Sequence, residues 1–202
     1  MLDRTALRML RPSFDAAAAS LQRAGVSADQ VTLFGFVTGV AAALAIATQH
    51  PLIGLVVLLA SRWCDGLDGE LARLTTPTDR GGFLDITLDF LVYASIPLAF
   101  AIADPAANAL AAALLLAAFI GTATTFLAFA VMAGQRGLKN AAYPSKGMYY
   151  LGGLTEGTET LACFALMCLW PAQFALFATV FAALCGLTIA TRLWAGWRAF
   201  SA

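Results

Sequence analysis

Charged residues are scarce in this chain, and most of what remains is apolar. Only 12% of the 202 residues are Asp, Glu, Lys or Arg, whereas 60% are hydrophobic. Soluble globular domains carry roughly twice that charge, about 25% of their residues. The apolar residues also form runs of about 20, the length needed to cross the hydrocarbon core of a bilayer. The composition excludes an ordinary soluble domain and indicates an integral membrane protein.

Histidine is scarce, and the four cysteines lie where we expect neither a metal site nor a disulfide framework. The single histidine, His50, lies far from the acidic residues discussed below. All four cysteines fall within apolar runs, where we expect them to pack as small apolar side chains in a reduced compartment. They are Cys64, Cys163, Cys168 and Cys185.

Six apolar runs predict an all-α protein with six transmembrane helices in a single domain, residues 1–202. The predicted bundle occupies residues 29–195, with spans at 29–49, 51–72, 82–103, 106–133, 148–169 and 172–195. Residues 1–26 carry four arginines and lack the compact apolar core and cleavage site of a secretory signal. Their leucines and Phe14 recur at helical spacing, so we expect an amphipathic interfacial helix on the membrane surface.

Lysine and arginine are missing from one side of this predicted bundle. The connections around His50, Asp104 and Pro171 contain neither, and Arg62, within the second span, is the only exception to the one-sided placement described next. The remaining cations fall at or near the opposite face: Arg4, Arg8, Arg11, Arg23, Arg73, Arg80, Arg136, Lys139, Lys146, Arg192 and Arg198. By the positive-inside rule, both termini face the cytoplasm in the cytoplasmic (inner) membrane.

Four aspartates lie within two neighbouring spans. Asp65 and Asp68 are three residues apart, and Asp85 and Asp89 are four apart, so each pair shares one face of a helix. A lone aspartate at the bilayer centre costs about 2.5–3.5 kcal/mol on insertion scales, so four need something to neutralise them. Bound divalent cations are the natural candidate.

The residue types around these carboxylates favour phosphoryl chemistry. Hard oxygen ligands without histidine or cysteine select magnesium, manganese or calcium over zinc or copper. Two such ions can bridge a diphosphate and stabilise charge on the attacking and leaving oxygens. Gly69, Ala72 and Gly81 clear space beside the carboxylates, and Arg73 stands where it can reach a phosphate. The turn between the two helices is predicted to face the cytosol, where nucleotides and metal are available.

The same residues resemble the signature of the CDP-alcohol phosphotransferases, also called CDP-alcohol phosphatidyltransferases. That signature is D-x-x-D-G-x-x-A-R, a short loop, then G-x-x-x-D-x-x-x-D. The chain fills every fixed position, with Asp65, Asp68, Gly69, Ala72, Arg73, Gly81, Asp85 and Asp89. The loop has seven residues where many members have eight, a difference that we place in the exposed turn. Because eight positions match, and the six-span layout with an amphipathic N-terminal helix matches too, the resemblance covers nearly the whole chain.

The resemblance implies transfer of a substituted phosphate, such as phosphatidyl, from CDP-diacylglycerol or another CDP-alcohol to a small alcohol, with release of CMP. It implies two divalent cations, Mg²⁺ or Mn²⁺, held by Asp65, Asp68, Asp85 and Asp89, with Asp89 also the catalytic base. It implies a donor site lined by Asp65, Gly69, Ala72, Arg73 and Gly81. It further implies a homodimer in the lipid bilayer, and no nucleic-acid partner is expected.

The start of the first span is less conclusive. SADQVT at 27–32 resembles the family's P-N-x-x-T pattern, with Ala28 and Asp29 in place of proline and asparagine. Asp29 is therefore expected either to cap the helix N-terminus or to contact substrate.

Three alternatives to this enzyme remain. A cation transporter would also bury carboxylates, but it needs polar residues continuing to the far side, where these spans are apolar. Membrane prenyltransferases use aspartate pairs with magnesium, but without D-G-x-x-A-R. Salt bridges to Arg62 and Arg73 could pair some of the aspartates, yet two arginines cannot neutralise four.

The acceptor is the least determined part of the prediction. Glu156 and Glu159 lie inside the fifth predicted span, where they could face a hydroxyl-rich or cationic acceptor or pair with Arg62 or nearby hydroxyls. Lys139 and Lys146, near the cytoplasmic rim, could instead bind an acceptor phosphate. Relatives that use phosphorylated acceptors often have arginine in the fifth span. Since this span has none, we expect a non-phosphorylated small alcohol.

Overall fold

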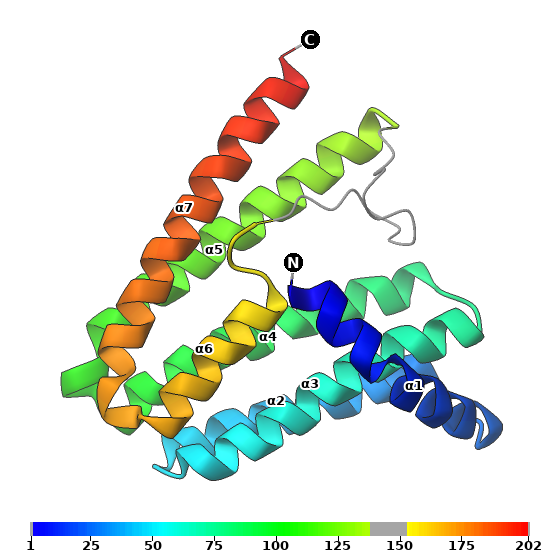
Figure 1. Ribbon diagram of the computed structural model, residues 1–202, viewed down its shortest axis with the longest axis horizontal. Coiled ribbons are helices and arrows are strands. Elements are labelled where there is room, and N and C mark those ends of the chain that lie inside the picture. Colours follow the sequence, from blue (N-terminus) through cyan, green and yellow to red (C-terminus); the bar gives the residue numbers. More distant parts are fainter. Residues whose placement is uncertain (1, 138–152, 202) are drawn as a thin grey trace.

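The computed structural model describes residues 2–137 and 153–201, with side chains from Ser13 onward. Within these residues the fold is all-α, as predicted, and contains no strand. Figure 1 shows the helices α1 (Leu2–Arg23), α2 (Ala28–Ala47), α3 (Pro51–Leu74), α4 (Asp79–Ala103), α5 (Pro105–Gln135), α6 (Gly157–Leu169) and α7 (Phe174–Phe200), with the short 3-10 helix η1 (Pro171–Gln173) before α7.

Short polar side chains decide where the long helices begin. Ser27 caps α2, because its hydroxyl accepts from the Gln30 amide at 3.3 Å while the Gln30 side chain accepts from the Ser27 amide at 2.9 Å. The alternative that Asp29 caps this helix is therefore wrong, since Asp29 lies within its first turn. Thr78 caps α4 through the Gly81 amide at 3.0 Å, and Asp104 caps α5 through the Ala107 amide at 3.1 Å.

In the described part of the chain, four helical segments are long and apolar enough to cross a membrane: α2, α4, α5 and Pro171–Phe200, which joins η1 to α7. The helix α3 has 24 residues but is more polar, because its second half carries the acidic motif. The described part of the fifth predicted span differs from the prediction. Its helix begins at Gly157 rather than near 148, and its 13 residues reach about 20 Å, short of the roughly 30 Å core of a bilayer.

Small residues let α2 approach both of the helices that carry the aspartates. A Cβ added at Gly35 would lie 3.1 Å from Cys64 of α3, and one added at Gly39 would lie 2.6 Å from Val92 of α4. The G-x-x-x-G spacing of these two glycines therefore serves packing within the chain. Below this contact a buried apolar core continues from Leu58 to Phe100, whose ring stacks on Phe174 at 4.5 Å.

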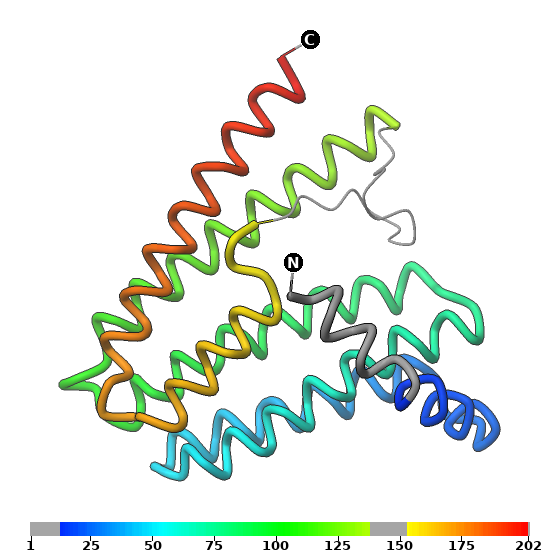
Figure 2. Tube along the Cα trace, viewed as in Figure 1, coloured from blue at the N-terminus to red at the C-terminus, as the bar shows by residue number. Residues whose placement is uncertain are grey.

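The connections fall at two opposite ends of the bundle. Figure 2 shows the turns around His50, Asp104 and Pro171 gathered at one end, while the turn from α3 to α4 and the last turns of α5 and α7 point the other way. The predicted division of the chain into a lysine- and arginine-free end and a basic end therefore matches the course of the described helices.

Candidate active site

The four aspartates of α3 and α4 line one small cavity. These helices run roughly antiparallel and are joined by the short turn at 75–78, and both pack against α2, so the last half of α3 and the first half of α4 face the same cavity. The cavity measures about 10 Å³, room for about one water molecule or ion. The structure thus brings together the carboxylates that the sequence placed on two separate helices, and it adds side chains from α2. The lining residues are Thr32, Gly35, Phe36, Arg62, Asp65, Asp68, Asp85, Leu88 and Asp89.

Asp68 is the most buried of the four and is held by α2. Only 4% of the residue is exposed, and the Thr32 hydroxyl donates a hydrogen bond of 2.5 Å to its Oδ2. Thr32 also lies 3.1 Å from the carbonyl oxygen of Ala28. Thr32 occupies the threonine position of the P-N-x-x-T pattern, although no role was expected for it from the sequence. The match to this pattern is the sequence feature that could have indicated a role for Thr32 in the site.

Arg62, which the sequence offered only as a possible salt-bridge partner, also lines the site. Its guanidinium donates to and pairs with Asp89, and it lies 3.6 Å from Asp65 of its own helix. It also donates to the Ser61 hydroxyl at 3.3 Å and lies 5.3 Å from the centre of the Tyr93 ring. One turn deeper than Asp65, Arg62 closes the inner end of the carboxylate cluster.

The salt-bridge alternative is confirmed for Arg62 but not for Arg73. Arg62 pairs with two of the aspartates, but Arg73 pairs instead with Glu70 at 2.5 Å, one turn earlier on α3. Among the described residues that line the cavity, Arg62 is the one cation beside the four aspartates.

The oxygen atoms of this site are of the kind that binds divalent cations, but their positions do not enclose an ion. Carboxylate and hydroxyl oxygens are the ligands that Mg²⁺ and Mn²⁺ prefer. Among the described residues, however, no three acidic, histidine or cysteine side chains converge closely enough to enclose an ion. Protein donors hold two of the carboxylates instead: the Thr32 hydroxyl at Asp68 and the Arg62 guanidinium at Asp89.

The residues expected to bind the donor lie on the adjoining turns. Gly69 and Arg73 are neighbours, since a Cβ added at Gly69 would lie 3.6 Å from the Arg73 guanidinium. Gly81 is close to α2, where an added Cβ would lie 3.1 Å from Asp29. Asp29 forms an ion pair of 2.5 Å with Arg80. The starts of α2 and α4 are thus joined beside the aspartates.

The acceptor candidates lie elsewhere. Lys139 and Lys146 fall outside the described residues. Glu156 and Glu159 are at the start of α6, where the Glu156 amide donates to Glu159 at 3.2 Å and the Glu156 side chain accepts from the Gly153 amide at 3.0 Å. These two glutamates therefore act on the helix N-terminus, a structural role that the sequence analysis did not foresee.

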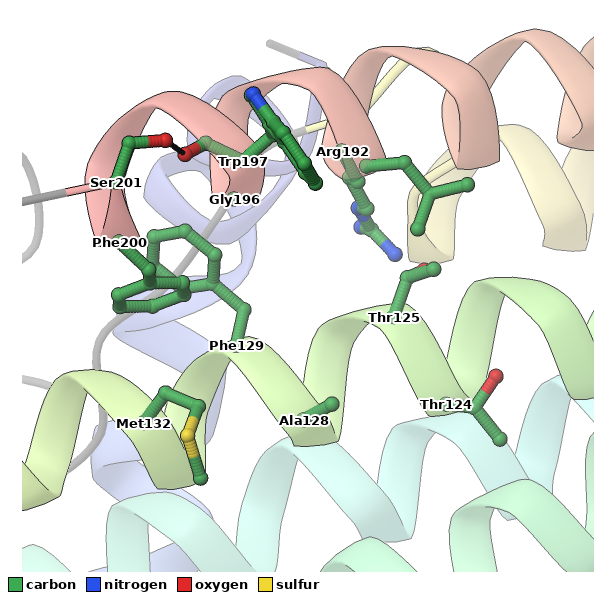
Figure 3. Close-up of a pocket in the computed structure, with 11 residues that line it drawn as sticks. Thr124, Thr125, Ala128, Phe129, Met132, Arg192, Gly196, Trp197, Phe200 and Ser201 are labelled. Carbon is green, nitrogen blue, oxygen red and sulfur yellow. Dashed lines mark hydrogen bonds between the residues drawn. The ribbon is translucent and has the colours of Figure 1, made fainter.

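A much larger cavity, about 840 Å³, opens between α5 and α7. Figure 3 shows the rings of Phe129 and Phe200 meeting across it and Arg192 extending from α7. The Arg192 guanidinium donates to the carbonyl oxygen of Thr122 at 3.0 Å. None of the four aspartates lines this cavity, so the larger volume does not mark the acidic site.

The fold and the site together define an all-helical membrane protein with carboxylates converging between α2, α3 and α4. Comparison with known proteins identifies the family. Residues 26–196 match the model of the CDP-alcohol phosphatidyltransferases, and the chain belongs to this family. The resemblance inferred from the signature is confirmed.

Known relatives agree with this assignment. The chain is 50% identical over 197 residues to the inner membrane protein YnjF of Escherichia coli (strain K12), covering 98% of this chain and 96% of that protein. A shorter match, 36% over 78 residues, covers 38% of this chain and 42% of the archaetidylinositol phosphate synthase of Pyrococcus horikoshii.

Crystal structures of the Mycobacterium tuberculosis phosphatidylinositol phosphate synthase PgsA1 share the fold. The form with CDP-DAG bound has a TM-score of 0.73 and 22% identity, over 91% of this chain and 93% of that chain. The form in complex with manganese and citrate has a TM-score of 0.71, also at 22% identity, over 91% and 88% of the two chains.

Family membership fixes the class of reaction. The protein is a transferase of phospholipid synthesis that depends on divalent metal and moves a substituted phosphate from a CDP-alcohol to an alcohol, releasing CMP. The comparisons give no support to the cation transporter or the prenyltransferase.

Proposed function

We propose that the protein transfers the phosphatidyl group of CDP-diacylglycerol to a small, non-phosphorylated alcohol at the cytoplasmic face of the inner membrane. The observation that carries this proposal is the convergence of Asp65, Asp68, Asp85 and Asp89 on one cavity beside a complete family signature. The CDP-DAG bound to PgsA1 supports the choice of donor. The name of the 50% identical relative supports the choice of membrane.

The four aspartates would hold two divalent cations, Mg²⁺ or Mn²⁺, and the manganese complex of PgsA1 supports this choice. When bound, such ions neutralise a diphosphate and stabilise the charge that develops during phosphoryl transfer. Asp68 and Asp85 are assigned to metal, Asp65 to metal and the donor site, and Asp89 to metal and catalysis. Thr32 orients Asp68 by its 2.5 Å hydrogen bond.

Asp89 would accept the proton of the acceptor hydroxyl. The hydroxyl oxygen attacks the phosphorus that carries diacylglycerol, a new P–O bond forms, and the P–O bond to CMP breaks. A positioned carboxylate base contributes about 10²- to 10⁴-fold to such a reaction. Asp89 lies deeper than Asp85 on α4 and is about a quarter exposed, so it remains reachable from the cavity.

The donor's cytidine diphosphate would lie along the turn of α3 that follows the first two aspartates. Gly69 and Ala72 leave room on that face, and Arg73, with 59% of its side chain exposed, can turn from Glu70 to a phosphate. Gly81 would close the other side, at the start of α4.

The roles of the aspartates are tested by separating donor binding from chemistry. Asp65→Asn, Asp68→Asn and Asp85→Asn should each weaken metal-dependent binding of CDP-diacylglycerol and abolish CMP release. Asp89→Asn should lower kcat by about 100-fold or more while changing donor affinity much less. Full activity in any two of these variants would contradict the assignment.

The acceptor is proposed to approach Glu156 and Glu159, with Lys146 contributing less. Glutamine at 159 can still accept the hydrogen bond from the Glu156 amide, so Glu159→Gln removes charge while preserving the start of α6. Together with Glu156→Gln, it should raise the KM for the alcohol, whereas Lys146→Ala should have a smaller effect.

A panel of phosphorylated and unphosphorylated alcohols, assayed for CMP release and lipid product, decides the acceptor. The proposal predicts turnover with an unphosphorylated alcohol. Exclusive use of glycerol 3-phosphate or inositol phosphate, lost selectively in Lys146→Ala, would place the acceptor at Lys139 and Lys146 instead.

The whole chain is proposed to form a homodimer of six-span subunits, with residues 1–26 as the interfacial segment. Within this segment, Phe14 and Ala18 are buried against α3, and a Cβ added at Gly66 would lie 2.7 Å from the Phe14 ring. This contact supports a helix that lies across the cytoplasmic end of the acidic helices.

A further inference from the structure

Arg62 occupies the position where positive charge is most needed. It pairs with Asp89 of α4 and lies 3.6 Å from Asp65, so it bridges the two acidic helices. Only 10% of its side chain is exposed. A buried carboxylate without a partner is costly, and a guanidinium with its fork of donors is well suited to hold two of them.

The Arg62 guanidinium is not fully satisfied by these contacts. Its Nε is buried without a hydrogen-bond partner, an unusual condition for a permanent structural ion pair. Two uncharged groups also contact the guanidinium. Its carbon lies 5.3 Å from the centre of the Tyr93 ring, and one terminal nitrogen donates to the Ser61 hydroxyl at 3.3 Å. Cation–π contact can retain the charge if the carboxylates are withdrawn.

A divalent cation at the aspartates would have to share this cavity with the Arg62 side chain. With a volume of about 10 Å³ it has space for one small particle, and the carboxylates do not yet enclose an ion. A divalent cation bound by Asp65 and Asp89 would compete with Arg62 for the same oxygens and be repelled by its charge.

We infer that Arg62 is an internal counter-cation of the carboxylate cluster, which holds Asp89 and Asp65 in the metal-free protein and moves toward Tyr93 when metal binds. The inference rests on the proposed metal site. Arg62 is a positioning residue here: it sets metal affinity and keeps the metal-free cluster folded, without touching substrate. Asp89 can accept a proton only after the metal has displaced Arg62 from it.

Mn²⁺ binding to the purified full chain tests the inference, measured by the electron paramagnetic resonance signal of free Mn²⁺ during titration, without substrate. Arg62→Gln should bind Mn²⁺ about tenfold tighter or more than the wild type, because a nearby positive charge is removed. Arg62→Lys keeps the charge and should stay within about threefold of the wild type. Arg198→Gln removes an exposed cation that lies against Trp194, and should leave the affinity unchanged.

Thermal unfolding provides the second readout. In chelator, Arg62→Gln should unfold at a lower temperature than the wild type. Saturating Mn²⁺ should raise the Tm of Arg62→Gln by more than it raises the Tm of the wild type. Tyr93→Leu removes the aromatic ring toward which Arg62 is inferred to move, and it should therefore weaken Mn²⁺ binding. This variant tests the inference even if Arg62→Gln does not fold.

The outcomes separate this inference from the proposed metal site. Equal or weaker Mn²⁺ binding in Arg62→Gln than in the wild type, with two ions still bound by both, would overturn the counter-cation role alone. Absence of Mn²⁺ binding in both proteins would overturn the metal site and the inference with it.

Discussion

At the scale of single residues, the hydroxyl of Thr32 and the guanidinium of Arg62 hold the acidic cluster in place. Each contacts one aspartate across a helix boundary: Thr32 reaches Asp68 from α2, and Arg62 reaches Asp89 from α3. Carboxylates buried among apolar helices need such partners, since an unmet hydrogen bond to a charged group costs more than one to a neutral group.

Replacing Thr32 by valine keeps the shape of the side chain and removes the hydrogen bond to Asp68. We expect Thr32→Val to lower the free energy of unfolding by about 1.5–3 kcal/mol in chelator, the range for hydrogen bonds to charged groups. Denaturant titration in detergent measures this change. Thr38→Val is the matched control, because the Thr38 hydroxyl bonds only the Phe34 carbonyl of its own helix at 2.8 Å. Equal losses in the two variants would contradict a special role for Thr32.

The sequence predicted the aspartates but not their protein partners, and the reason is physical. A carboxylate in an apolar run stands out because its cost in a membrane is large, and the spacing of Asp65, Asp68, Asp85 and Asp89 fits a known signature. The partner of Asp68 depends on how α2 packs against α3, 36 positions away. Periodicity within one helix carries no information about that contact.

At the scale of helices, the site depends on how closely α2 approaches α4. An alanine at Gly39 would place its Cβ 2.6 Å from Val92, which is fully buried. Gly39→Ala should therefore destabilise the protein by about 1–3 kcal/mol through overpacking and reduce activity by moving Thr32 and Asp85 apart.

A double-mutant cycle checks this contact. Val92→Ala should recover part of the stability lost in Gly39→Ala, because it removes the methyl groups that clash. Gly186→Ala, on an exposed face of α7 with no atom within 4 Å of the added Cβ, should be neutral or slightly stabilising. Additive losses in the double variant would show that the two residues do not meet.

The start of α6 shows where hydropathy alone fails. The apolar run suggested a span from 148, yet the described helix begins at Gly157, because Glu156 and Glu159 form a reciprocal cap there. The same chemistry was visible in the sequence as a polar residue followed three positions later by glutamate. An acid inside a membrane helix is a functional candidate, but Glu156 and Glu159 lie at the helix start, where they act as a cap.

The cap and the proposed acceptor role of Glu159 make different predictions. Glu159→Ala removes the acceptor of the Glu156 amide and should cost about 0.5–2 kcal/mol of stability, whereas Glu159→Gln should cost less than 0.5 kcal/mol. If Glu159→Gln is as unstable as Glu159→Ala, the glutamate's charge rather than its hydrogen bond maintains the helix start. Thermal unfolding of the two variants, without substrate, distinguishes these results.

At the scale of the whole molecule, the distribution of charge predicts which end faces the cytoplasm. Thr76→Cys, in the turn between the acidic helices, should react with an impermeant thiol reagent only from the cytoplasmic side. Ala106→Cys, near the opposite end, should react only from outside. Both positions are exposed and spare the caps at Thr78 and Asp104. Because all four native cysteines are buried, they should react little with the impermeant reagent, and the unmodified chain serves as the control for their labelling.

The reversed labelling pattern would contradict the predicted orientation, since the carboxylate cavity would then open away from the supply of CDP-alcohol. Labelling of both variants from one side would contradict the opposite placement of the two ends in Figure 1.

The central claim is that the four-aspartate cavity carries out metal-dependent transfer from a CDP-alcohol. Its most direct test is CMP release by the purified protein from CDP-diacylglycerol with a panel of alcohols, first with Mn²⁺ or Mg²⁺ and then with chelator. We predict that CMP release requires an alcohol, falls to background in chelator, returns when Mn²⁺ or Mg²⁺ is restored, and is at least about 100-fold slower in Asp89→Asn. An undiminished rate of CMP release in chelator would contradict it.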